Sequence, residues 1–378
     1  MHRFWRTIKK ADWLLYSGVA FLIGIGISLI FSISRNNELL EGEVLKQSIA
    51  VGIGLAFLVA LLMIDYRSLR PYAWLFYGLA ILLLILVMFF GVEINGARSW
   101  FQVGSFLFQP VEFAKLALII LLASFFTREK GELYRVRTFL LSGLITAVPV
   151  FLTVLQPDYG SAFLLLLIWG GLVLAAGVRK LYLSIGGLIG LLGLVGLWQF
   201  ILTEGQKARF TAFLDPSSDA LGAGFNTIQS MIAIGSGGVA GRGLGLGSQS
   251  QLNFLPEQQT DFIFAVASEE LGLIGAAFIL ALFLFVIVRC FYAALKSPDR
   301  FGTLLGIAIT TLLIAQVFIN IGTNLGLLPV TGLPLPFVSA GRSSMMIWLA
   351  LMGIIGSIAI RKSSADLKRM ENKQNNLT

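Results

Sequence analysis

The chain has 378 residues, of which 57% are hydrophobic and only 13% are charged. A soluble domain of this size needs more polar residues to cover its surface, so the composition indicates an integral membrane protein. The single cysteine, Cys290, excludes an intrachain disulfide, and the single histidine, His2, excludes a Ser-His-Asp triad and histidine metal sites. The net charge of +8 is spread over short segments between apolar runs, which argues against nucleic-acid binding.

Apolar runs that are long enough to cross a bilayer core, about 20 residues each, follow one another along the chain. We therefore predict an all-α integral membrane protein of about ten transmembrane helices, near 13–34, 47–64, 72–91, 111–126, 138–155, 160–178, 181–202, 262–290, 302–324 and 341–360. Most of the 28 Lys and Arg residues lie in the termini and in connections on the same side, which predicts that both termini are cytoplasmic. Residues 1–362 are expected to form a single polytopic domain, and 363–378 a polar cytoplasmic tail without regular structure.

Three outward connections are long, at about 91–110, 203–260 and 325–340, and the longest joins the seventh and eighth expected helices. Long ordered loops usually have a function. The first contains Asn-Gly-Ala-Arg-Ser-Trp, residues 95–100. Arg98 could hold a phosphate or a carboxylate, and Trp100 is expected either to anchor the chain at the membrane interface or to stack on a sugar.

Glu112 and Lys115 lie at the start of the fourth expected helix. Their i, i+3 spacing brings opposite charges together on one helix face, where they can pair. Because a charge inside a bilayer is costly unless it is paired, this pair either orients helices or tunes a polar cavity beneath the first outward loop. Gln-Pro-Asp-Tyr-Gly, residues 156–160, is typical of a tight turn.

The connection 203–260 holds the densest group of polar residues. Arg209 precedes a Gly-rich stretch, and Arg242 lies in Gly-Arg-Gly-Leu-Gly-Leu-Gly, whose amides are expected either to contact phosphate oxygens or to form flexible turns. Glu257 and Asp261 follow just before the eighth helix. A carboxylate at the position of Asp261 either caps this helix or takes part in catalysis.

Two further features concern the last three expected helices. Glu269 and Glu270 fall inside the eighth helix, so we expect them to face the bundle interior or a wet cavity. The segment 325–340 is apolar but is broken by three prolines, which excludes one straight spanning helix. It is expected to be a re-entrant or cavity-lining segment whose backbone groups find partners within the protein.

Five motifs occur in a fixed order along these helices. They are Asn95-Gly-Ala-Arg-Ser-Trp100, Gln109-Pro-Val-Glu-Phe-Ala-Lys115, Gln156-Pro-Asp-Tyr-Gly160, Phe254-Leu-Pro-Glu-Gln-Gln-Thr-Asp261-Phe and Gly332-Leu-Pro-Leu-Pro-Phe337. With the ten expected helices, the chain resembles the SEDS family (shape, elongation, division and sporulation), and most closely its rod-shape members, over most of its length. It departs from the family pattern at Gln259, where histidine is frequent, and at Arg342, where glycine is more usual.

The resemblance implies a peptidoglycan glycosyltransferase of the SEDS fold at the outer face of the bacterial inner membrane, active in cell elongation. Its substrate would be lipid II, a disaccharide-pentapeptide on an undecaprenyl pyrophosphate carrier, which it adds to a growing glycan strand. The family's catalytic aspartate falls on Asp261, and its motif positions fall on Trp100, Glu112 and Lys115. A class B penicillin-binding protein is the partner that the resemblance implies.

The reaction implied would convert an α-linked donor sugar into a β-linked polymer, which needs one inverting displacement and one base. Asp261 is the expected base, and Arg98, Arg209, Arg242 and Lys115 are the cations available for the leaving pyrophosphate. Since the available metal ligands are hard oxygens, a divalent cation that contributes here would be Mg²⁺ or Mn²⁺. A lipid II flippase and a purely structural scaffold are the two alternatives to the enzyme.

Overall fold

The computed structural model describes residues 9–35, 42–94, 96–104, 106–129, 136–178 and 224–375, with isolated residues between 182 and 215. In this part of the chain, nine helices are long and apolar enough to cross a membrane. They are α2 (Trp13–Ser34), α3 (Glu43–Met63), α4 (Ala73–Phe90), α5 (Pro110–Arg128), α6 (Val136–Leu155), α7 (Tyr159–Ala176), α12 (Ile263–Leu295), α13 (Arg300–Asn324) and α14 (Arg342–Asn375). These nine confirm the expected helical membrane fold, whereas the helix expected at 181–202 falls largely outside the described residues.

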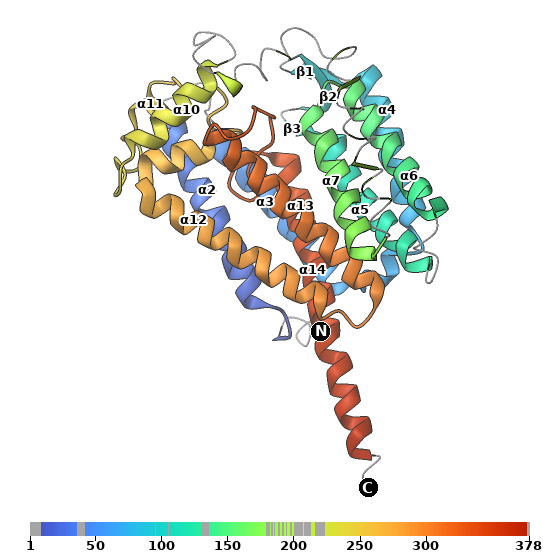
Figure 1. Ribbon diagram of the computed structural model, residues 1–378. Helices are drawn as coiled ribbons and strands as arrows, with labels where there is room; N and C mark the ends of the chain where they lie inside the picture. Colours follow the sequence, from blue (N-terminus) through green and yellow to red (C-terminus); the bar gives the residue numbers. More distant parts are fainter. Residues whose placement is uncertain are drawn as a thin grey trace.

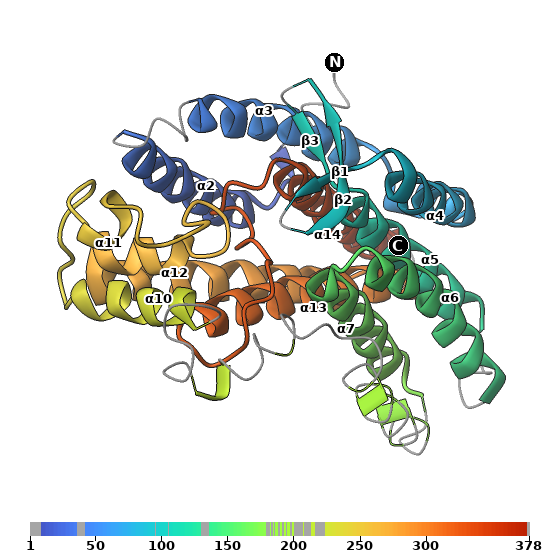
Figure 2. The same cartoon turned by 90° about the horizontal axis from the view of Figure 1, so that it is seen from above.

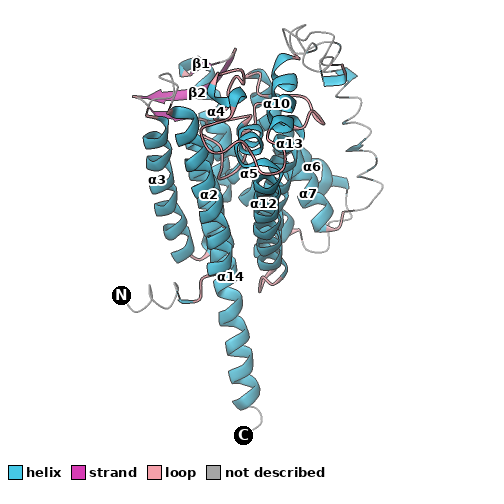
Figure 3. Ribbon diagram, turned by 90° about the vertical axis from the view of Figure 1, so that its left-hand side faces the viewer, coloured by secondary structure: helices cyan, strands magenta, loops and turns pink. Residues whose placement is uncertain are grey.

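The helices run side by side between two ends of the molecule (Figures 1 and 3). One end carries the strands β1 (Val92–Ile94), β2 (Ala97–Val103) and β3 (Phe106–Phe108), together with α10 (Phe225–Ser236) and α11 (Ser248–Gln251). We call it the sheet end. The start of α2 and the end of α14 lie toward the opposite end, which we call the termini end.

Three helices form the centre of the bundle. In the most apolar window of α5, α13 and α14, 83%, 72% and 89% of the residues are buried, whereas the value for α3 and α4 is 22%. Seen from above, the other helices surround these three (Figure 2). Helices with one buried stripe expose their remaining apolar faces, as expected when lipid is the solvent. A side chain on α5, α13 or α14 is therefore the most shielded from lipid and water.

The connection 91–110 was expected to be a loop, and this expectation was wrong. It forms a three-stranded antiparallel sheet in the order β1-β2-β3. Asn-Gly at 95–96 is a strong sequence signal for a hairpin turn, and Gly96 has φ +80°. Gly104, with φ +63°, lies in the second turn. The sheet gives Arg98 and Trp100 fixed positions on β2.

The expected eighth helix is broken near its start. Within α12, Gly272 has φ 68° and ψ −168°, a conformation open essentially to glycine alone. A Cβ at this position would lie 2.2 Å from the backbone nitrogen of Gly241. The Gly-rich segment 237–247 therefore lies directly against the break, and the part of α12 before Gly272 is set apart from the long remainder.

The segment 325–341 contains no helix, in agreement with the expected re-entrant segment. Its backbone groups find partners on α13, since Gln316 Nε2 donates to the Pro334 oxygen (2.8 Å) and Asn320 Nδ2 to the Leu333 oxygen (2.8 Å). The side chains of Leu333, Leu335, Phe337 and Val338 are buried. The segment thus folds back into the sheet end and fills it.

The tail expected to lack regular structure is instead helical up to Asn375, as the continuation of α14 beyond the bundle (Figures 1 and 3). Lys, Ala, Leu, Arg, Met and Glu make up most of 362–373, and these are good helix formers. Because the helix is already nucleated inside the bundle, each added residue extends it at little cost.

At the termini end, the connection before α4 binds the connection before α13. Arg67 Nε, in the 3-10 helix η2 (Tyr66–Leu69), donates to Asp299 Oδ2 at 2.8 Å, and Tyr66 Oη donates to the same oxygen. Burial opposes ionisation of Asp299, but hydrogen bonds from Tyr66, Gly302 and Arg67 outweigh it and lower the pKa of this carboxyl.

Candidate active site

Asp261 lies at the sheet end, two residues before α12 begins. Its backbone oxygen accepts hydrogen bonds from Asn320 Nδ2 (2.9 Å) and Asn324 Nδ2 (2.8 Å), both on the last turns of α13. The N-cap of α12 is Phe262, without a side-chain cap hydrogen bond. Phe262, and not Asp261, therefore occupies the N-cap position of α12, and the bonds from α13 fix Asp261 through its main chain.

Asp261 is half-buried, and its carboxylate lies beside the re-entrant segment. A Cβ at Gly332 would lie 3.9 Å from Asp261 Oδ2, and Gly332 itself is exposed. The next layer is the start of α7, where a Cβ at Gly160 would overlap the Thr331 oxygen at 2.4 Å. Glycine at position 160 therefore allows α7 to pack closely against Thr331, and Gly332, with φ +70°, lies beside the aspartate.

Glu257 shapes the turn that leads to Asp261. It has a positive φ of 49°, and its backbone oxygen accepts from the amides of Thr260 (3.1 Å) and Asp261 (3.0 Å). Thr260 Oγ1 also donates to Glu257 Oε2 at 3.3 Å. Glu257 is exposed, so it supports the turn from the outside.

Glu112 and Lys115 form an ion pair on α5, with 2.7 Å between Lys115 Nζ and Glu112 Oε1. Their side chains are 3% and 1% exposed, so the pair is fully buried. Next to it, Gln109 Nε2 donates to Asp158 Oδ2 at 3.0 Å, and Asp158 Oδ1 caps α7 by accepting from the Ser161 amide at 3.0 Å. The tight turn expected at 156–160 is present, and its aspartate connects α5 to α7.

Asp158 lies between α6 and α7, close to this ion pair. Burial raises the pKa of its carboxyl, although the hydrogen bonds from Ser161 and Gln109 and the charge of Lys115 oppose the rise. The ion pair with Glu112 thus holds Lys115 inside the protein, where its charge also favours the ionised form of Asp158.

The two hairpin residues differ in exposure. Arg98 is exposed and lies opposite Glu93 in the strand register, whereas Trp100 is half-buried and lies opposite Val92. The sheet is tied to the bundle by Ser343, which donates to the Leu107 oxygen at 3.0 Å. Arg98 is therefore the hairpin cation that a ligand at the sheet end can reach.

The Gly-rich segment does not offer the phosphate cradle that its sequence allowed. Amides of this segment donate within the protein, since the Arg242 amide donates to the Glu269 oxygen (3.0 Å) and the Gly243 amide to the Glu270 oxygen (2.9 Å). Just after the segment, the amides of Gln249 (2.8 Å) and Ser250 (3.0 Å) donate to the carboxylate of Glu269. Glu270 accepts from the Gly245 amide (3.2 Å) and from Ser32 Oγ (2.6 Å). Glu269 and Glu270 are buried as expected, and their role is to hold this segment against α12.

Two arginines of this connection were also predicted to bind the pyrophosphate, Arg242 and Arg209. Arg242 is exposed, and its guanidinium bonds to the Ser236 oxygen (3.1 Å) and to Ser248 Oγ (3.0 Å). It is accessible from the sheet end. Arg209 lies outside the described residues.

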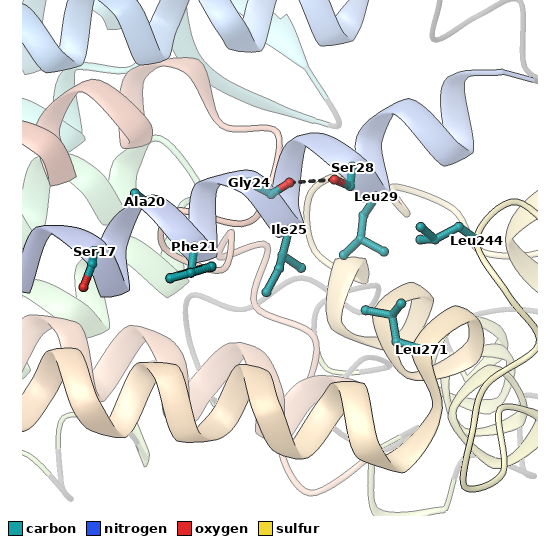
Figure 4. A pocket seen from close by; sticks show the side chains of 9 residues that line it. All are labelled: Ser17, Ala20, Phe21, Gly24, Ile25, Ser28, Leu29, Leu244 and Leu271. Atoms are coloured by element: carbon teal, nitrogen blue, oxygen red, sulfur yellow. Dashed lines mark hydrogen bonds between the residues drawn. The ribbon is translucent and has the colours of Figure 1, made fainter. Parts of the chain in front are cut away.

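An apolar groove of about 520 Å³ lies between α2 and α12 (Figure 4). Its hydroxyl groups are satisfied within α2, since Ser17 donates to the Leu14 oxygen and Ser28 to the Gly24 oxygen. Leu244 and Leu271 line one end. The groove suits a hydrocarbon chain or an apolar side chain, and its lining contains no group for acid–base chemistry.

The described residues of the sheet end contain no cluster of metal-binding side chains. Among the residues that the structure describes, no group of three or more His, Cys, Asp or Glu could hold a metal ion. The expected divalent cation therefore lacks a matching ligand set in that part of the chain.

Several residues that organise the site were not predicted as such. Asn320 and Asn324 share one face of α13, and their i, i+4 spacing at the end of an apolar helix was visible in the sequence. Asp158 was expected to act only in a turn. Contacts between distant segments, such as Glu43 with Arg342, carry no local sequence signal.

Comparison with known proteins agrees with this arrangement. Residues 13–364 match the family model described as "Cell cycle protein", which covers FtsW, RodA and SpoVE. The chain is 37% identical to stage V sporulation protein E of Bacillus subtilis, over 93% of this chain and 98% of the relative. It is 35% identical to peptidoglycan glycosyltransferase MrdB of Escherichia coli K12, over 94% and 95% of the two chains.

Solved structures show the same fold. A chain from a structure described as "Structural coordination of polymerization and crosslinking by a peptidoglycan synthase complex" aligns with a TM-score of 0.81 and 32% identity, over 93% of this chain and 98% of that one. RodA of Thermus thermophilus aligns with a TM-score of 0.70 and 31% identity, over 93% and 97%. The chain therefore belongs to the SEDS family, that of FtsW, RodA and SpoVE, and is a peptidoglycan glycosyltransferase.

Proposed function

We propose that the protein polymerises lipid II at the sheet end, with Asp261 as the general base. The observation that carries this proposal is the position of Asp261 in a fixed turn beside Gly332, at the end of the bundle where the sheet and the re-entrant segment lie. The proposal places the sheet end on the outer side of the bacterial inner membrane and both termini in the cytoplasm. The distribution of Lys and Arg predicts this orientation.

The base withdraws a proton from the acceptor hydroxyl while that oxygen attacks the anomeric carbon of the donor sugar. The bond from this carbon to the carrier pyrophosphate breaks, and the configuration inverts in one displacement. The Asp261 carboxylate suits this step. Histidine is the commonest general base in enzymes, but the chain's single histidine, His2, is far from Asp261 in the sequence.

The leaving pyrophosphate needs positive charge. Arg98 and Arg242 are exposed at the sheet end, so they can meet a ligand. Lys115 is buried in its ion pair with Glu112, and its proposed role is to hold α5 and α7 in place around the site. Trp100, half-buried on β2, is proposed as a stacking surface for a sugar.

We further propose a class B penicillin-binding protein as the partner that crosslinks the glycan. The similarity to a chain of a peptidoglycan synthase complex supports such an assembly. The role in cell elongation rests on the likeness to RodA, and identities of 37% to stage V sporulation protein E and 35% to MrdB support each branch of the family about equally.

The test is polymerisation of purified lipid II by the wild-type protein with its cognate penicillin-binding protein. We expect Asp261→Asn and Asp261→Ala to abolish glycan strands while the proteins stay folded and bind the partner. Glu129→Gln, a carboxylate at the opposite end of the bundle just after α5, is the control and should keep activity. Normal polymerisation by Asp261→Asn would rule out Asp261 as the base.

A further inference from the structure

Arg342, which departs from the family pattern, forms an ion pair across the sheet end. It is the first residue of α14, and its Nη2 lies 2.6 Å from Glu43 Oε1 and 2.8 Å from Glu43 Oε2. Glu43 is the first residue of α3 and also accepts from Lys46 Nζ at 3.0 Å. The Arg342 and Glu43 side chains are only 15% and 16% exposed, so this ion pair is stronger than an ordinary surface pair.

One turn further along α3, Gln47 contacts the same region. Its side chain is almost fully buried and its Nε2 donates to the Ser339 oxygen at 3.1 Å. Ser339 Oγ in turn donates to the Thr260 oxygen at 2.5 Å and accepts from the Leu335 amide at 2.8 Å. Ser339 therefore connects α3, the re-entrant segment and the residue that precedes Asp261.

A parallel backbone contact strengthens this connection. The Ala340 amide donates to the Gln259 oxygen at 2.8 Å, so two successive residues, 339 and 340, hold two successive residues before the aspartate, 259 and 260. Two residues after Ala340 stands Arg342 with its ion pair. We call Glu43, Gln47, Ser339 and Arg342 the α3 clamp.

We propose that the α3 clamp positions Asp261 for catalysis, with Glu43 and Arg342 as its ion-pair lock. The four residues are positioning residues, and the inference rests on the proposed role of Asp261 as the base. The asparagines of α13 fix the backbone of Asp261 from one side, and the clamp fixes the two residues before it from another. Loss of the lock frees residues 339–342, and the aspartate then shifts relative to the acceptor hydroxyl.

The pair between Arg289 and Asp12 at the termini end provides a matched control. Arg289 donates through Nε (3.1 Å) and Nη2 (2.5 Å) to Asp12 Oδ2, and the two side chains are 28% and 11% exposed. Arg342→Gln and Arg289→Gln each remove one partly buried arginine from a carboxylate. Only the first belongs to the clamp.

The experiment measures lipid II polymerisation over a range of pH for the full-length protein with its penicillin-binding protein. We expect Arg342→Gln and Ser339→Ala to lower the rate about tenfold to 100-fold, the size of effect that a misplacement near 1 Å produces. They should also move the acid limb of the pH–rate profile, because the environment of the base changes. A variant that is only less completely folded lowers the rate by the same factor at every pH and leaves the acid limb at the same pH. Arg289→Gln should leave the acid limb in place.

The charge-swapped variant Glu43→Arg/Arg342→Glu completes the test. It should recover at least half of the rate lost by Glu43→Arg alone, because the opposite charges are restored. The clamp is refuted if Asp261→Asn is inactive while Arg342→Gln and Ser339→Ala keep the wild-type rate and acid limb, or if the swap recovers nothing. If Asp261→Asn is itself active, the proposed base fails, which is a separate result.

Discussion

The buried ion pair on α5 makes an asymmetric prediction for stability. Lys115→Met keeps the approximate volume of the side chain but removes the only ammonium of the pair, so Glu112 is left buried without its cation. Removing one partner of a buried ion pair typically costs about 3–5 kcal/mol. The Coulomb attraction between Lys115 and Asp158 is lost as well, so we expect the upper part of this range.

Glu112→Gln should cost less. Lys115 keeps the nearby charge of Asp158, and the glutamine oxygen can still accept its hydrogen bond. We expect a cost of about 1.5–3 kcal/mol, the usual range for a hydrogen bond to a charged group. The double variant Glu112→Gln/Lys115→Met should be less destabilised than Lys115→Met, because no unpaired carboxylate remains at position 112, although the attraction between Lys115 and Asp158 is still lost.

The assay is the free energy of unfolding, measured by titrating the detergent-solubilised protein with sodium dodecyl sulfate. Leu118→Met on the same helix is the control, since its site is also fully buried and the change conserves volume, at a cost below about 1.5 kcal/mol. The reasoning is refuted if Lys115→Met lies within about 1 kcal/mol of wild type, or if Glu112→Gln is the more damaging of the two single variants.

Three further predictions concern other parts of the structure. Gly272→Ala should lower the free energy of unfolding by at least about 3 kcal/mol in the same assay, because its backbone conformation is strained for alanine and a Cβ would overlap the Gly-rich segment. The control Gly52→Ala, with open space around it, should be nearly neutral. Asn320→Ala removes a hydrogen bond to the Asp261 oxygen, so the free energy lost from the polymerisation rate should exceed the loss in the free energy of unfolding. Equal losses in the two free energies would contradict this prediction. Asp299 has a lowered pKa, so its stabilising contribution is complete above its ordinary pKa of about 3.9 and is lost as the pH falls through the lower folded-state value. The difference in the free energy of unfolding between wild type and Asp299→Asn should therefore shrink below about pH 4. A difference that stays constant with pH would contradict this prediction.

The helical fold was predictable from the sequence because each spanning helix must satisfy its own backbone and cover itself with apolar residues. Both requirements are local, so α2 appears at Trp13–Ser34, as the apolar run predicted. The hairpin was missed because its strands are short and read as a loop, although Asn-Gly at 95–96 indicated the turn. The break at Gly272 was missed because the glycine stands in a continuous apolar run, and its conformation is set by contact with Gly241.

The site was predictable only in part. Glu112 and Lys115 are neighbours on one helix, so their spacing was sufficient to predict the ion pair. The bond between Ser339 and the Thr260 oxygen joins residues 79 positions apart, and the pair of Glu43 with Arg342 spans 299 positions. Such contacts depend on how α3, α13 and α14 come together, which composition and periodicity do not determine. The motifs identified candidate residues, and the tertiary structure determines which of them are in contact.

The distribution of buried charge along α5 also separates polymerisation from transport of lipid II. A flippase needs a polar path from one end of the bundle to the other, because the disaccharide-pentapeptide headgroup cannot cross an apolar interior at a tolerable cost. Glu112 and Lys115 lie at the sheet end of α5, and the next six buried positions toward the termini end, residues 117–122, are Ala, Leu and Ile. On α14, Trp348 and Leu351 are likewise buried in the middle of the bundle. In the described part of these two central helices, the buried charged pair therefore lies near the end that carries Asp261, and the buried polar side chains toward the other end are the hydroxyls of Ser124, Thr127 and Ser357. A glycosyltransferase that receives its substrate from that side needs no more than this, since donor, acceptor and base all meet at one face.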